Sequence, residues 1–152
     1  MNKVPLVLIA LAAGTIGAAC ALSGVAQVEH AGQRGQGMSR LARLPGQMYF
    51  YVYIAAGFTV GIQGNGLDRL GGATLVGAGG GLLDSAIQST LMPLIVRLAR
   101  GLPAGRTQRM KLNRLFIFGV VVHALACAWW ALLGSLLAGA IRVAGPWRGA
   151  AS

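Results

Sequence analysis

The segment LFIFGVVVHALACAWWALLGSLLAGAI, residues 115–141, contains no Lys, Arg, Asp or Glu, and its one histidine is His123. The hydrocarbon core of a bilayer is about 30 Å thick, so a helix needs about 20 consecutive apolar residues to cross it. Because lipid offers no hydrogen-bond partners, the backbone of such a segment must pair its own polar groups, as a helix does. This segment therefore predicts a transmembrane helix.

Three further long runs precede it, at residues 4–28, 44–67 and 70–96, and the third contains a single charge, Asp84. The run at 44–67 is the weakest, because its dense apolar part covers only residues 49–62. None of the runs alternates with a period of two, which argues against a membrane β-barrel. The sequence predicts an all-α, polytopic membrane protein with about four spans, or three if residues 44–67 do not cross. We expect residues 1–152 to form one membrane domain, with basic loops at 29–43 and 97–114.

The composition excludes most other classes of protein. The chain has 152 residues, of which 55% are hydrophobic and 11% are charged, and its formal net charge is +10. A soluble domain has about 25% charged residues, and a disordered chain is poor in apolar residues. We expect the protein to lie in a bacterial inner membrane, where membrane lipid is one of its partners.

The distribution of basic residues predicts an orientation. Loops rich in Lys and Arg remain on the cytoplasmic side of a membrane. With four spans, nine of the 13 basic residues fall on the side of the loops 29–43 and 97–114, and four fall on the other side. The four-span topology thus has cytoplasmic basic loops and both termini outside. A three-span form with the amino terminus inside is the alternative, and a leader cleaved before Cys20 is a second one.

The loop 97–114 carries the strongest local charge. We interpret it as a topological anchor that contacts anionic lipid, with docking of an acidic partner protein as the alternative. The loop has no aromatic residue for base stacking, so nucleic-acid binding is not expected. Its basic residues are Arg97, Arg100, Arg106, Arg109, Lys111 and Arg114.

Small residues recur at intervals of four in the predicted helices. Gly57 and Gly61 share one helix face, and Gly77 and Gly81 share another. Such spacing lets helix backbones approach closely in lipid. The glycine faces predict tight helix packing, either within this chain or against other subunits, including a second copy of the chain.

Asp84 is the most informative single residue, because a charge at the bilayer centre costs at least about 2.5–3.5 kcal/mol on insertion scales. It lies thirteen residues before Arg97, or about 20 Å along a helix, while His123 lies nine residues after Arg114, or about 14 Å. These similar depths predict a contact between Asp84 and His123, with Gln88 on the same helix face as Asp84. The pair is either a proton or cation site or a polar contact that holds the helices together.

Nothing in the sequence indicates catalysis. No nucleophile lies next to a base in a recognised motif, no phosphate-binding loop is present, and His30 and His123 are too isolated to suggest a metal or cofactor. We therefore expect a protein that is not an enzyme. The favoured expectation is a structural or assembly subunit of a larger membrane complex, of the secretion, conjugation or export type. The alternative is an ion- or proton-coupled transporter or channel that uses Asp84.

Overall fold

The computed structural model describes residues 3–33, 40–64, 66–101 and 114–144, which form four helices and, over those ranges, no strand. The helices are α1 (Lys3–Gln33), α2 (Arg40–Gln63), α3 (Gly66–Ala99) and α4 (Arg114–Ala144). The predicted all-α fold is confirmed.

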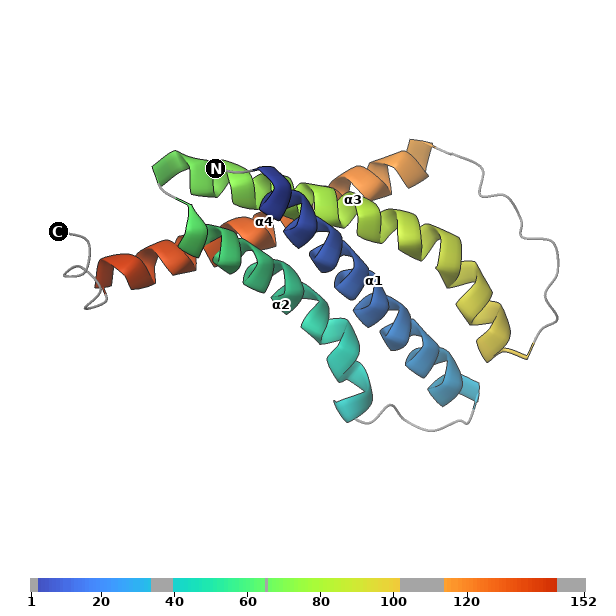
Figure 1. The fold of residues 1–152 in the computed structure, drawn as a ribbon. Coiled ribbons are helices and arrows are strands. Elements are labelled where there is room, and N and C mark those ends of the chain that lie inside the picture. Colours follow the sequence, from blue (N-terminus) through green and yellow to red (C-terminus); the bar gives the residue numbers. More distant parts are fainter. Residues whose placement is uncertain (1–2, 34–39, 65, 102–113, 145–152) are drawn as a thin grey trace.

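Consecutive helices run in opposite directions, so the bundle has two ends (Figure 1). α2 ends at Gln63 and α3 begins at Gly66, and the short connection between them is the α2–α3 turn. Gly66, which follows the turn, has a φ of 54°, a conformation that glycine adopts without strain. The start of α1 and the end of α4 lie at this turn end of the bundle, and the start of α4 lies at the opposite end (Figure 1). Around the bundle the helices are ordered α1, α3, α4, α2, and within the described residues α1 and α4 do not touch.

The interior of the bundle is built from small side chains. Buried positions on each helix recur three and four residues apart, as expected for one face of a helix. The buried face of α4 contains only Ala, Gly, Ser and Cys: Ala124, Cys127, Ala128, Ala131, Gly134, Ser135, Ala138 and Gly139. Small side chains that face each other allow the axes of neighbouring helices to lie close together in lipid.

The predicted glycine faces point into the bundle and contact α4. A β-carbon on Gly77 would lie 2.6 Å from the Cys127 carbonyl oxygen and from the Ala128 Cα, and one on Gly57 would overlap the backbone of Ala131. Gly61 and Gly81 make similarly close approaches to the same helix. Of the two alternatives for these glycines, packing within the chain is the one observed.

The outer surface of the bundle differs from that of a soluble protein in the number of large apolar side chains that it exposes. Large apolar side chains are exposed on all four helices, for example Leu8, Tyr51, Leu75, Leu125 and Trp129. Exposed hydroxyl groups such as those of Thr15 and Thr59 donate to carbonyls of their own helices, which satisfies them without water. α1, α3 and α4 are long and apolar enough to cross a membrane, whereas the apolar part of α2 is the shorter segment Met48–Gln63. The protein is a helical membrane protein.

Polar contacts connect the helices near both ends of the bundle. At the turn end, Arg142 Nη1 donates to the Gly64 carbonyl at 2.9 Å. At the opposite end, the Arg100 guanidinium forms two hydrogen bonds, of 2.9 and 3.0 Å, with the Glu29 carboxylate. These bonds raise the pKa of Arg100 above its already high ordinary value, so the arginine stays charged.

The helices extend into both of the predicted basic loops. Residues 29–33 belong to α1, residues 40–43 to α2, and Arg97 to α3, while Arg114 begins α4. Arg106, Arg109 and Lys111 lie outside the described residues.

Candidate functional site

Asp84 is buried completely in the middle of α3, where it faces α2 and α4. Four side chains contact its carboxylate. Oδ1 accepts a 2.6 Å hydrogen bond from Gln88 Nε2, one turn further along α3. Oδ2 lies 2.9 Å from His123 Nε2 on α4, 2.8 Å from the Tyr49 hydroxyl and 3.3 Å from the Tyr53 hydroxyl. Hydrogen bonds from these partners lower the energetic cost of burying a charged carboxylate.

The Tyr49 hydroxyl lies at the centre of this cluster. In addition to its bond with Asp84, it lies 2.5 Å from His123 Nε2 and 3.0 Å from Cys127 Sγ. Because a phenol has one proton, Tyr49 donates to Asp84 while its oxygen accepts from Cys127 or His123. The polar cluster, defined as Tyr49, Tyr53, Asp84, Gln88, His123 and Cys127, therefore connects α2, α3 and α4 through one continuous set of hydrogen bonds.

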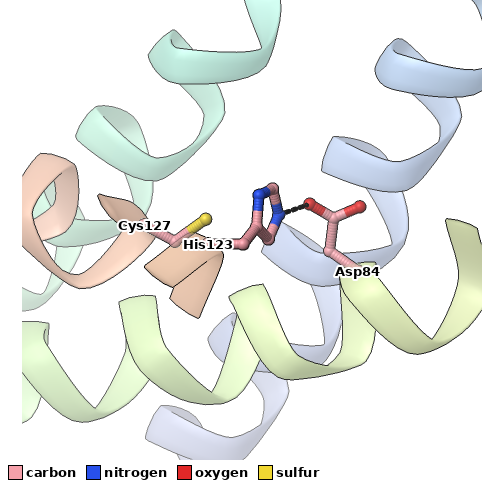
Figure 2. Close-up of side chains that lie close together, drawn as sticks. All are labelled: Asp84, His123 and Cys127. Atoms are coloured by element: carbon pink, nitrogen blue, oxygen red, sulfur yellow. Dashed lines mark hydrogen bonds and ion pairs between the residues drawn. The ribbon is translucent and has the colours of Figure 1, made fainter. Parts of the chain in front are cut away.

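Figure 2 shows how three of these side chains lie. The His123 ring is placed between the Cys127 thiol and the Asp84 carboxylate, and its Nε2 points to Asp84. His123 and Cys127 are four residues apart on α4, so they share one face of that helix.

Two glycines position Tyr53, the remaining aromatic group in contact with Asp84. A β-carbon on Gly17 of α1 would lie 3.1 Å from the Tyr53 hydroxyl oxygen, and one on Gly80 of α3 would lie 3.1 Å from the ring. The absence of a side chain at both positions makes room for the Tyr53 ring, which is fully buried. Its hydroxyl is thereby held within reach of Asp84.

The polar cluster lies where the tight packing of the bundle ends. Among the described side chains, none on α1 beyond Leu22, on α3 beyond Asp84, or on α4 before Ala124 is buried. The His123 side chain is 30% exposed, whereas the Asp84 side chain is not exposed at all. Among the described residues, buried side chains therefore lie on the side of the α2–α3 turn, and more exposed ones lie on the side of Arg100.

The residues of this cluster were predictable only in part. The contact of Asp84 with His123 and the position of Gln88 follow from helix depth and spacing, and both are present in the structure. Tyr49, Tyr53 and Cys127 are not among the site residues that the sequence predicts. The four-residue spacing from His123 to Cys127 was an available signal, whereas the two tyrosines resembled ordinary aromatic residues of a membrane interface.

Comparisons with family models, with curated proteins and with solved structures find no match to this chain.

Proposed function

We propose that this protein is a cation transporter of the membrane, in which Asp84 provides the charge that binds the cation. The observation that supports this most directly is the complete burial of a carboxylate among polar side chains of three helices. Ionisable residues in membrane-spanning helices are rare, and they commonly mark ion pathways. A purely structural contact between helices needs no carboxylate, because the glycine faces already hold the helices together.

The position of the cluster along the bundle also supports transport. On its more open side, α3 continues with the polar residues Gln88, Ser89 and Thr90. On the other side, Gly77, Gly80 and Gly81 pack closely against neighbouring helices. A binding site open toward one face and closed toward the other is the arrangement that alternating access requires at each stage of transport.

Reconstitution into liposomes tests this proposal. We expect the wild-type protein to move a cation down its gradient, measured with internal dyes for protons, alkali-metal ions and divalent metal ions. Asp84→Asn removes the charge at nearly constant volume, so flux should fall to the level of protein-free liposomes. Asp68→Asn is the matched control, because Asp68 lies exposed near the start of the same helix. Flux that persists in Asp84→Asn, or is absent for all cations in the wild type, contradicts the proposal.

A subunit of a larger membrane complex is the second candidate, and one observation favours it. An apolar groove of about 780 Å³ lies between the first halves of α1 and α3, with Leu6, Leu11, Leu75 and Leu83 in its lining. The glycine faces give this candidate no support, because they contact helices of the same chain. A photo-cross-linker at Leu75 that captures one membrane protein in stoichiometric amount, with no capture from exposed Leu125 on α4, would support it. Equal capture from both positions would exclude it.

We further propose that all four helices cross a bacterial inner membrane, with the Arg100 end cytoplasmic and the α2–α3 turn outside. The excess of basic residues near the Arg100 end supports this orientation. The whole of α2 is about 36 Å long, and its apolar part, Met48–Gln63, is about 24 Å, which is shorter than the hydrocarbon core, so the crossing of α2 is the part of this topology that needs testing.

A further inference from the structure

Three side chains of the polar cluster carry atoms that bind metal ions. Asp84 offers a carboxylate oxygen, His123 offers Nε2 and Cys127 offers Sγ, and these atoms all lie within 4.8 Å of one another. The Tyr49 hydroxyl oxygen lies between 2.5 and 3.0 Å from an atom of each. The four atoms come from three different helices, so it is the packing of these helices that brings them together.

The ligand atoms lie closer together than they would around a bound tetrahedral ion. Metal–ligand bonds of about 2.0–2.3 Å place the ligand atoms of a tetrahedral site about 3.3–3.7 Å apart. Asp84 Oδ2 lies 2.9 Å from His123 Nε2, and the Tyr49 oxygen lies 2.5–3.0 Å from an atom of each of the other three residues. Binding of an ion therefore requires the side chains to rotate apart, with the Tyr49 oxygen moving from the centre of the cluster to the fourth position.

The combination of ligand atoms selects a class of metal. Magnesium and calcium prefer oxygen ligands and six or more of them. A carboxylate, an imidazole and a thiolate in a tetrahedral arrangement suit zinc and its close neighbours among the transition metals. The burial of Asp84 and Cys127 would also keep the ion away from bulk water.

We propose that the cluster binds a divalent transition-metal ion of the zinc type through Asp84, His123 and Cys127. This proposal rests on the cation-binding role proposed above and names the class of cation. The ligands are the Asp84 carboxylate, the neutral His123 imidazole and the Cys127 thiolate, and the Tyr49 oxygen completes the site. Gln88 acts as a positioning residue, because its bond to Oδ1 leaves Oδ2 directed at the ion.

Charge balance supports this class of ion in a lipid environment. A divalent ion bound to a carboxylate, an imidazole and a thiolate gives a neutral site. A cysteine binds a metal ion as the thiolate, so binding releases the thiol proton. A neutral site avoids an uncompensated charge in a medium of low dielectric constant.

Titration of the purified full-length protein with Co²⁺ in detergent tests the proposal without any transport measurement. Tetrahedral Co²⁺ bound to a thiolate has visible absorption bands and a sulfur-to-metal charge-transfer band in the near ultraviolet. We expect both signals at one ion per chain, and we expect Zn²⁺ to abolish them by competition. Cys127→Ser should lose the charge-transfer band and bind Co²⁺ at least about 10–100-fold more weakly.

Cys20→Ser is the matched control, since Cys20 lies on α1, outside the polar cluster, and it should retain both signals. Circular dichroism of each variant checks that the helices are intact. No charge-transfer band in the wild type overturns the proposal, and so does a band that survives Cys127→Ser but is lost in Cys20→Ser. Transport of another cation without Co²⁺ binding refutes the metal site and leaves the transporter standing. Co²⁺ binding without any flux in liposomes refutes the transporter and leaves the metal site standing.

Discussion

At the scale of single residues, Asp84 organises the interior of this protein. It is fully buried, and its carboxylate contacts Tyr49, Tyr53, Gln88 and His123. Removal of one hydrogen-bond donor from a buried carboxylate lowers the free energy of unfolding, because no other group can replace the missing donor in lipid. The hydrogen-bond donors around Asp84 are therefore expected to contribute to stability as well as to ion binding.

Tyr49→Phe tests the contribution of the central hydroxyl. The change removes the donor to Asp84 while it leaves the ring in place, and we expect the free energy of unfolding to fall by about 1–3 kcal/mol. Tyr51→Phe on the same helix is the matched control, because Tyr51 is 65% exposed, and its effect should stay within about 0.5 kcal/mol. Chemical denaturation in detergent measures both changes. Equal effects of the two substitutions would show that the Tyr49 hydroxyl has no special role.

At the scale of the helices, the close approach of α4 to α2 and α3 depends on glycine. Gly57→Ala and Gly77→Ala each introduce a β-carbon against backbone atoms of α4, so we expect a loss of about 1–3 kcal/mol from overpacking. Thermal unfolding in detergent, followed by circular dichroism, measures the loss.

Gly119→Ala is the matched control for these two substitutions. No atom lies within 4 Å of the position its β-carbon would take, and alanine favours helix more than glycine does. This variant should be as stable as the wild type or slightly more stable. Losses at Gly57 and Gly77 no larger than the change at Gly119 would contradict the close packing of these two glycines against α4.

The helices were predictable from the sequence, whereas much of the polar cluster was not. Long apolar runs with at most one charge are expected to be helical in lipid, and the runs at 70–96 and 115–141 lie within α3 and α4. The depth of Asp84 and of His123 follows from counting residues along those helices. The participation of Tyr49 depends on how α2 is rotated about its own axis. That rotation is set by the contacts of Gly57 and Gly61 with α4, which local sequence does not specify.

At the scale of the whole molecule, the bundle has a tightly packed half and a more open half. The packed half runs from the α2–α3 turn to the level of Asp84 and also contains the groove between α1 and α3, and the open half runs from Asp84 toward Arg100. The polar cluster lies at the boundary between the two halves. If the helices cross the bilayer, this boundary is within the hydrocarbon region, and the buried carboxylate lies between two aqueous compartments.

A bundle that crosses the membrane has its two ends in different aqueous compartments and Asp84 between them. Labelling of single cysteines in intact cells with a reagent that cannot cross membranes distinguishes the two ends. In a background without Cys20 and Cys127, we would place one cysteine at Gln63, next to the α2–α3 turn, and in a second variant one at Arg100, at the opposite end. We expect Gln63→Cys to react in intact cells and Arg100→Cys to react only after the membrane is opened. Reaction of both positions from the same side would contradict a bundle that crosses the membrane.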